Sequence, residues 1–192
     1  MFEPILKNIS RYIQLTPGET NYFTSTLKER KFRRKQYLLQ EGDISRYENF
    51  VTKGCLRTYQ VDQKGQEYIV QFAIEDWWIG DMNSFTAQQP SRYNIDALED
   101  SVVLSIEKTA MDELYIKVPK FEKFFRHLLQ NAFIAFQERI ASNISETGEE
   151  RYKQFRSKNS KLEERIPQRM IASFLGLTPE SLSRIRRQFA NK

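Results

Sequence analysis

Two short amphipathic segments separated by a glycine, near the C-terminus, constrain the fold more tightly than any other part of the chain. Over residues 166–175, apolar side chains recur every three or four positions, the period of a helix that buries one face. Gly176 follows, where a helix C-terminus favours a residue that tolerates positive φ. Thr178 offers an N-cap hydroxyl, and Pro179 suits the first position of a new helix. The pattern therefore predicts two helices joined by a tight turn.

The second of these helices combines an apolar stripe with cationic faces. Its stripe consists of Leu182, Ile185 and Phe189, and its other faces carry Arg184, Arg186 and Arg187. A helix, a short turn with glycine and a cationic helix are typical of a helix-turn-helix, whose second helix enters the DNA major groove. An ordinary helical hairpin with a solvated basic face is the structural alternative.

The distribution of charge favours DNA binding over that alternative. Residues 151–192 contain eleven Lys or Arg and three Asp or Glu, a net charge of +8, whereas the whole chain carries +5. Residues 1–150 therefore carry about −3. A basic module on a slightly acidic body is the expected electrostatic signature of a DNA-binding protein. An acidic membrane would attract the same charge, but the arginine helix lacks a broad lipid-facing apolar side.

Cysteine and histidine usage excludes several classes of function. Cys55 is the only cysteine, which rules out an internal disulfide and a cysteine-ligated metal cluster within one chain. His127 is the only histidine, so multi-histidine metal sites and Ser-His-Asp catalysis lack their residues. No apolar run approaches the roughly 20 residues of a membrane span, and the N-terminus lacks a signal-peptide core. We expect a cytoplasmic protein with no metal and no enzymatic activity.

The texture of the sequence predicts an α+β fold. Residues 1–29 have a helical pattern, interrupted at 15–18, with Glu19 to Leu27 expected to be helical again. From Lys31 to Ile106, short segments rich in β-formers alternate with turn signals at a spacing of roughly ten residues. This spacing predicts an N-terminal antiparallel β-barrel or jelly roll. Residues 146–165 are polar and predict a hinge and a short helix.

Between these regions, residues 107–118 are expected to be helical, and a longer helix is expected over residues 119–145. The longer helix would extend about 40 Å, which exceeds what a small barrel can cover. We therefore predict that part of its apolar surface meets a second copy of the chain, through Phe125, Leu129, Phe133, Phe136 and Ile140. A helix packed wholly within its own chain is the alternative. The predicted domains are 1–118 (effector-sensing barrel), 119–146 (dimerisation helix) and 147–192 (helix-turn-helix).

This order of elements and four motifs resemble the Crp/Fnr family of bacterial transcription regulators. Residues 37–43 are similar to the family's G-x-x-L-x-x-x-G-D, and residues 50–57 to its Y-x-v-x-x-G-x-v-r. Residues 78–81 are similar to its f-x-G-E. The closest match is over residues 166–185, to t-q-x-x-i-A-x-x-l-G-x-t-x-E-t-x-S-R. The resemblance covers essentially the whole chain.

The resemblance implies a homodimer that binds a near-palindromic promoter site and contacts RNA polymerase, with recognition helices about 34 Å apart. By position, Glu180, Ser183 and Arg184 are then the base contacts, with hydrogen bonds to cytosine N4 and to guanine O6 and N7 that suit a TGA-type half-site. The side chains suited to phosphates are Gln168, Arg169, Thr178, Ser181 and Arg187. Pro179 replaces an arginine of other members, and residues 146–165 show little strand character for a β-wing.

The effector pocket departs from the family's pattern. Members that bind cyclic nucleotides use Gly-Glu for the ribose and Arg-Ser for the cyclic phosphate. Here the corresponding positions carry Gly80-Asp81 and Ser91-Arg92, a shorter carboxylate and a reversed pair. Because adjacent side chains of an extended strand point to opposite faces, the reversal is expected to direct Arg92 away from the pocket. We predict no control by cyclic AMP and no cofactor, with the effector unknown.

Two other classes of function are compatible with a barrel followed by a basic helical region. A small-molecule sensor whose basic tail docks a protein partner would bind DNA without regard to operator sequence. A cupin-type enzyme has a similar barrel, but its metal needs clustered histidines, which this chain lacks. A sequence-specific DNA-binding regulator is therefore the leading hypothesis.

Overall fold

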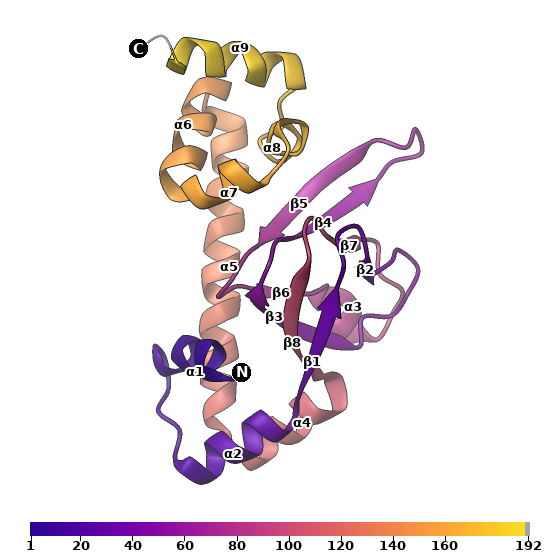
Figure 1. Cartoon of the computed structure of the whole chain (residues 1–192), viewed down its shortest axis with the longest axis vertical. Helices are drawn as coiled ribbons and strands as arrows, with labels where there is room; N and C mark the ends of the chain where they lie inside the picture. Colours follow the sequence, from indigo (N-terminus) through magenta and orange to yellow (C-terminus); the bar gives the residue numbers. More distant parts are fainter. Residues whose placement is uncertain (191–192) are drawn as a thin grey trace.

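The computed structural model describes residues 1–190 and places two β-sheets beside one long helix (Figure 1). The helices are α1 (Glu3–Ser10), α2 (Pro17–Ser25), α3 (Met82–Ala87), α4 (Lys108–Lys117), α5 (Lys120–Ser145), α6 (Gly148–Lys158), α7 (Ser160–Arg165), α8 (Gln168–Phe174) and α9 (Pro179–Ala190). The strands are β1 (Leu27–Phe32), β2 (Tyr37–Leu39), β3 (Tyr47–Lys53), β4 (Leu56–Val61), β5 (Glu67–Ala73), β6 (Trp78–Ile79), β7 (Asn94–Ala97) and β8 (Ser101–Glu107). Residues 191–192 of the predicted C-terminal domain lie outside the described residues.

All strand pairings are antiparallel, as the sequence predicts for a jelly roll. One sheet has the order β1-β8-β3-β6, and the other has the order β2-β7-β4-β5. Sequence neighbours such as β1 and β2 fall in different sheets, so the chain crosses repeatedly between the two layers. The α+β fold class is confirmed.

Successive side chains of a strand point to opposite faces of its sheet, and the two faces of the first sheet contribute to two different cores. Val51 of β3 is fully buried between the sheets, where it packs with residues such as Leu56 and Ile95. Its neighbour Phe50 points to the opposite face of the same strand and joins a second core beneath the helices, together with Phe85 of α3. This period of two fixes which side of the first sheet the long helix covers.

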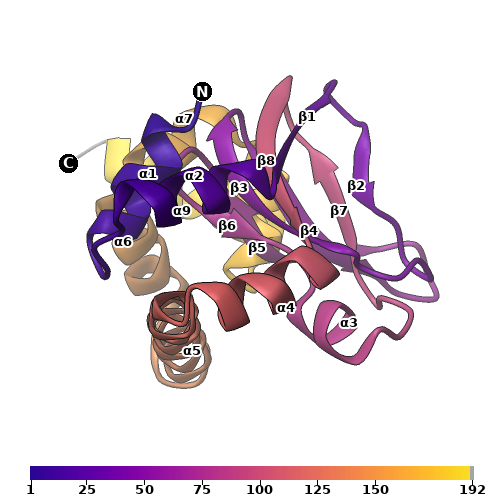
Figure 2. The same ribbon diagram turned by 90° about the horizontal axis from the view of Figure 1, so that it is seen from below.

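The N-terminal half of α5 completes that second core. Its aromatic rings Phe121 and Phe124 are fully buried and pack with α1, α2 and α4, and Figure 2 shows α4 leading from the sheets to α5. The helix begins and ends almost where the sequence predicts. The helix expected from Glu19 to Leu27 lies two residues earlier, however: α2 begins at Pro17, within the expected interruption, and ends at Ser25, and Leu27 already pairs with Ile106 in the sheet.

The C-terminal helices form a third core with the outer face of β4 and β5. Thr147 precedes α6 and forms a capping box with Glu150. The Thr147 hydroxyl accepts from the Glu150 N–H, and the Glu150 carboxylate accepts from the Thr147 N–H. The single short helix predicted over residues 146–165 is wrong, because Asn159 leaves helical geometry (φ −136°) and α7 begins anew. The break allows both Phe155 and Leu162 to face the core.

Candidate DNA-binding surface and effector cassette

The predicted helix-turn-helix is present as α8, a tight turn and α9. Gly176 adopts φ +65°, the left-handed conformation that favours glycine, and the Leu177 N–H donates to the Ala172 carbonyl at 2.9 Å. Thr178 then accepts from the Ser181 N–H at 3.2 Å, which satisfies a free donor of the first turn of α9. Leu182 and Ile185 hold α9 on the C-terminal core.

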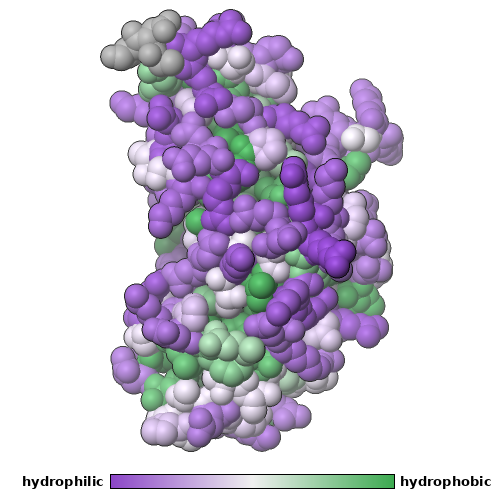
Figure 3. All heavy atoms as spheres, viewed as in Figure 1, coloured by the Kyte–Doolittle hydropathy of each residue, from purple (hydrophilic) through white to green (hydrophobic). Residues whose placement is uncertain are grey.

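The solvent face of α9 carries the predicted base contacts. Glu180, Ser183 and Arg184 are exposed, as is Arg187. Within residues 1–190, no carboxylate pairs with Arg184 or Arg187, so both guanidinium groups are available to an external anion. Hydrophilic side chains dominate the C-terminal helices on the face shown in Figure 3.

The predicted phosphate contacts divide into two groups. Arg169 is exposed at the start of α8, and Gln168 beside it is half-buried. Thr178 and Ser181 are engaged with each other, since their hydroxyls lie 3.1 Å apart in addition to the capping bond. Their first role is therefore to shape the start of α9.

Arg186 has a structural partner that the sequence does not reveal. Its Nε donates to the Tyr152 hydroxyl at 3.1 Å, and Tyr152 donates in turn to Glu163. Burial raises the pKa of Tyr152, and its bond to Glu163 raises it further, so the hydroxyl stays protonated. Arg156 also pairs with Glu163, at 3.0 Å. This cluster ties α9 to α6 and α7, and the bond to Tyr152 distinguishes Arg186 from Arg184 and Arg187, although all three are exposed.

Helix α8 is also fixed to the edge of the second sheet. The Ser173 hydroxyl accepts from the Ile69 N–H and donates to the Glu67 carbonyl, each at 3.0 Å. Arg165 of α7 binds Glu75 at 2.8 Å and also pairs with Glu99. The contacts hold the helix-turn-helix against strand β5, an arrangement visible in Figure 1.

Three of the four predicted effector residues come together around α3, in a segment we call the cassette (residues 80–92). Asp81 caps α3 by accepting from the N–H groups of Asn83 and Ser84, at 3.1 and 3.2 Å. The buried Ser91 donates its hydroxyl to the second oxygen of Asp81 at 2.7 Å. Arg92 is exposed and does not take part. The carboxylate is therefore saturated by the cassette itself.

The buried carboxyl of Glu48 lies against Gly80. A Cβ at this position would lie 2.5 Å from Glu48 Oε1. Burial raises the pKa of Glu48 to about 8, with a further contribution from the charge of Asp81. No motif identifies Glu48 in the sequence. The charge of Asp81 makes this cassette a poor site for an anionic cyclic phosphate.

The C-terminal half of α5 exposes a row of large apolar side chains. Leu129, Phe133, Phe136 and Ile140 are between 41% and 62% exposed. Phe125 differs: it is only 7% exposed, and its ring packs on Trp78 and Tyr115 of its own chain. Its assignment to a partner-facing surface is corrected, because it lies on the side of the helix turned toward the sheets.

The single histidine and the single cysteine lie apart from the surfaces described above. His127 stacks on Tyr12, with ring centroids 5.3 Å apart, and Cys55 is a buried free thiol. Among the described residues, the histidine, cysteine and acidic side chains form no group of three suited to a metal ion. None of the described helices has the length and apolar composition needed to cross a membrane.

Comparisons with known proteins match this architecture. The cyclic nucleotide-binding domain family matches residues 29–117. The fumarate and nitrate reduction regulatory protein of Vibrio cholerae is 28% identical over 190 residues, covering 91% of this chain and 74% of that protein. FixK2 of Bradyrhizobium japonicum shares the fold with a TM-score of 0.77 at 17% identity, over 86% of this chain and 85% of that one.

A second solved structure carries the family name. It is described as a transcriptional regulator of the Crp/Fnr family from Eubacterium rectale, and it superposes with a TM-score of 0.69 at 17% identity. The match covers 92% of this chain and 84% of the other. The chain therefore shares the fold of both solved structures and is similar in sequence to the regulatory protein of Vibrio cholerae over most of its length.

Proposed function

We propose that the chain acts as a homodimer on a near-palindromic promoter site, where it regulates transcription in a sequence-specific manner. The observation that carries this proposal is the exposure of Arg184 and Arg187 on α9, for which residues 1–190 provide no carboxylate partner, on a helix whose opposite face packs on a core. An arginine that is not bound by a carboxylate can donate hydrogen bonds to DNA, because phosphates and guanine edges are acceptors.

The positions of the side chains on α8 and α9 suggest which of them contact bases and which contact phosphates. Glu180, Ser183 and Arg184 contact bases, since their side chains leave the exposed face of α9 near its N-terminus. The proposed phosphate contacts are Gln168, Arg169, Thr178, Ser181 and Arg187. Phosphate contacts set the register on the duplex, and base contacts carry the specificity.

The proposed dimer places two copies of α5 side by side. The exposed row from Leu129 to Ile140 would otherwise leave several large apolar side chains in water, at a cost of about 25 cal/mol for each Å². A two-fold interface buries the same row of both copies. It also gives two recognition helices, which a palindromic site requires, about 34 Å apart along the duplex.

Further parts of the proposal concern organisation and partners. The chain is proposed to divide into a sensor region (1–118), a dimerisation helix (119–146) and a DNA-binding region (147–192). RNA polymerase is the proposed second macromolecular partner, and the cytoplasm is the proposed location. The saturated Asp81 and the excluded Arg92 support regulation by something other than cyclic AMP. The matched relative is a regulatory protein, which agrees with the prediction that the chain is not an enzyme.

The test is fluorescence anisotropy with the DNA upstream of the protein's own gene and a scrambled duplex, at physiological salt. We expect at least a thousandfold preference for the promoter DNA. Arg184→Ala should weaken binding to the promoter by about 1–3 kcal/mol and relax base preference. Lys7→Ala, on α1, removes the same charge far from α9 and should leave affinity unchanged.

Equal affinity for both duplexes would support the alternative, a sensor whose basic region docks a protein. An Arg184→Ala variant with unaltered base preference would remove this residue from the base contacts.

A further inference from the structure

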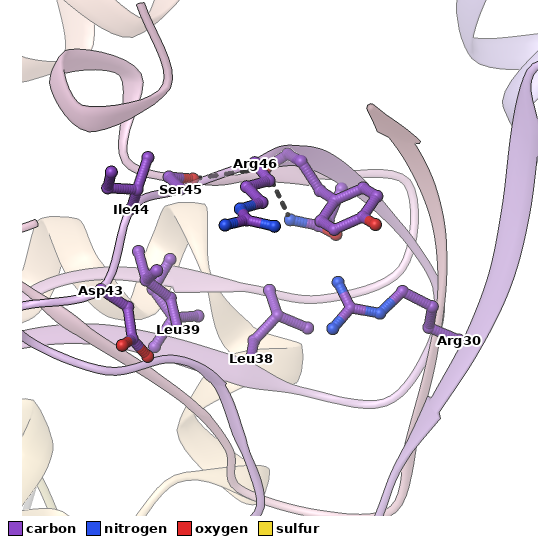
Figure 4. Close-up of a pocket in the computed structure, with 10 residues that line it drawn as sticks. Arg30, Leu38, Leu39, Asp43, Ile44, Ser45 and Arg46 are labelled. Carbon is purple, nitrogen blue, oxygen red and sulfur yellow. Dashed lines mark hydrogen bonds between the residues drawn. The ribbon is translucent and has the colours of Figure 1, made fainter. Parts of the chain in front are cut away.

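A cavity of about 280 Å³ opens at one end of the barrel, apart from the cassette (Figure 4). Its apolar floor is formed by Leu38, Leu39 and Ile95. Arg30 of β1 and Arg46, from the loop before β3, line its sides. Neither Asp81 nor any other predicted effector residue lines it, so this space is not the cyclic nucleotide position of the family.

Two guanidinium groups point into the same space in Figure 4. Arg30 is held by two aromatic rings, with its guanidinium carbon 4.9 Å from the centroid of Phe32 and 4.8 Å from that of Tyr47. Within residues 1–190, neither Arg30 nor Arg46 has an ion-pair partner. Asp43 also lines the cavity, but its carboxylate points away from both groups.

The positive charges of Arg30 and Arg46 at this cavity are not balanced by an anionic group of the described residues. Burial lowers the pKa of Arg30, which shows that part of its hydration is lost without a compensating anion. The contrast is Arg57, which is also buried but is bound by Asp96 at 2.8 Å and by Glu67 at 2.5 Å. A second cation at Arg46 makes the need for a counter-charge greater.

We propose that this cavity binds a small amphipathic anion, with its carboxylate or phosphate group between Arg30 and Arg46 and its apolar part on Leu38 and Leu39. Arginine offers planar, paired donors that suit both kinds of anion. Two rings already hold the Arg30 side chain in place, so little side-chain entropy is lost when the anion binds. Binding itself is independent of the proposed DNA-binding function.

A connection to the cassette gives such an anion a route to act. The wall formed by residues 43–46 is bonded to the cassette, since the Ser45 N–H donates to Ser84 Oγ at 2.9 Å and Ile44 forms a β-bridge with Pro90. Ser84 lies in the first turn of α3, where its N–H donates to the Asp81 cap. Ligand binding would therefore order a wall that the predicted effector region shares; this step rests on the proposed function.

The test is isothermal titration calorimetry of the full chain with three probes that share an apolar ring. Phenyl phosphate and 3-phenylpropanoate carry the two anions, and 3-phenylpropanol is neutral. We expect at least one anion to bind at least tenfold more tightly than the alcohol. Tighter binding of phenyl phosphate assigns the site to phosphates, and tighter binding of 3-phenylpropanoate assigns it to carboxylates.

Variants localise the binding. Arg30→Gln and Arg46→Gln should each weaken the better anion at least tenfold, whereas Arg33→Gln should change its affinity less than twofold. Arg33 is exposed, does not line the cavity, and loses the same charge. Because Arg46 is on the surface, its variant tests the site even where Arg30→Gln perturbs the barrel. The proposal is overturned by anions that bind no better than the alcohol, or by an affinity that both cavity variants retain.

Discussion

Replacing Glu48 by glutamine should stabilise the protein increasingly as the pH rises from 5 to 8. The Glu48 carboxyl is buried on β3 against Gly80, and burial raises its pKa from 4.5 to about 8. The pKa of Glu48 is higher in the folded chain than in the unfolded chain. The neutral carboxyl therefore makes its full contribution to the free energy of unfolding below pH 4.5. This contribution is lost progressively as the pH approaches 8, because only the unfolded chain releases the proton readily.

The size of the effect follows from the shift. Between these pH values, the wild-type free energy of unfolding loses about 1.4 kcal/mol for each pH unit relative to a neutral isostere. At pH 7, Glu48→Gln should therefore exceed the wild type by about 3 kcal/mol, and at pH 4.5 the two should be nearly equal. The nearby charge of Asp81 acts in the same direction, since it opposes a second negative charge.

The assay is urea unfolding followed by tryptophan fluorescence, at one protein concentration and at several pH values from 4.5 to 8. A fixed concentration is needed because the stability of an oligomer depends on it. Glu164→Gln is the matched control, since Glu164 is exposed and its substitution should have a small effect at every pH. A Glu48→Gln effect that is the same at pH 5 and pH 8 would refute the reasoning.

Three further perturbations test other parts of the molecule. Ile140→Glu places a charge in the exposed row of α5 and should give monomers by sedimentation equilibrium; an intact dimer would reject this surface as the interface. Gly54→Ala should lower stability by about 3 kcal/mol in urea unfolding, because Gly54 has φ +103° and its added Cβ would lie 2.7 Å from the Ser101 backbone; an unchanged midpoint would contradict this. Arg187→Ala should weaken promoter and scrambled DNA alike and reduce the slope of log affinity against log salt by about 1; a loss confined to the promoter would make Arg187 a base contact.

Much of the fold could be predicted because its signals are local and periodic. The long helix, the strands β4 and β5, and the turn at Gly176 each have a pattern that one kind of structure satisfies. Strand β1 was only partly anticipated, because its sequence LKERKF is mostly charged. An edge strand tolerates such residues on its exposed side, and β1 is an edge of its sheet. Strand β6 is two residues long, too short for any period to be visible.

The site was less predictable, because several functional distinctions depend on contacts between distant segments. Arg184 and Arg186 lie two positions apart on one helix, and only the position of Tyr152 separates a free guanidinium from a bound one. The same limit applies to Phe125 and Phe133, which share an apolar pattern along α5. Phe125 packs on Trp78 and Phe133 faces solvent, and this difference depends on which side of α5 the sheets cover.

The contact between α8 and β5 connects the helix-turn-helix to the sheet that lies beside the cassette. The orientation of α9 is set by α8, and α8 is bonded through Ser173 to the backbone of β5 at Ile69 and Glu67. The Glu67 side chain binds Arg57, which also binds Asp96 on β7, the strand that directly follows the cassette. Two ion pairs and one serine therefore form a continuous series of polar contacts from β7 to α8, the helix that precedes α9.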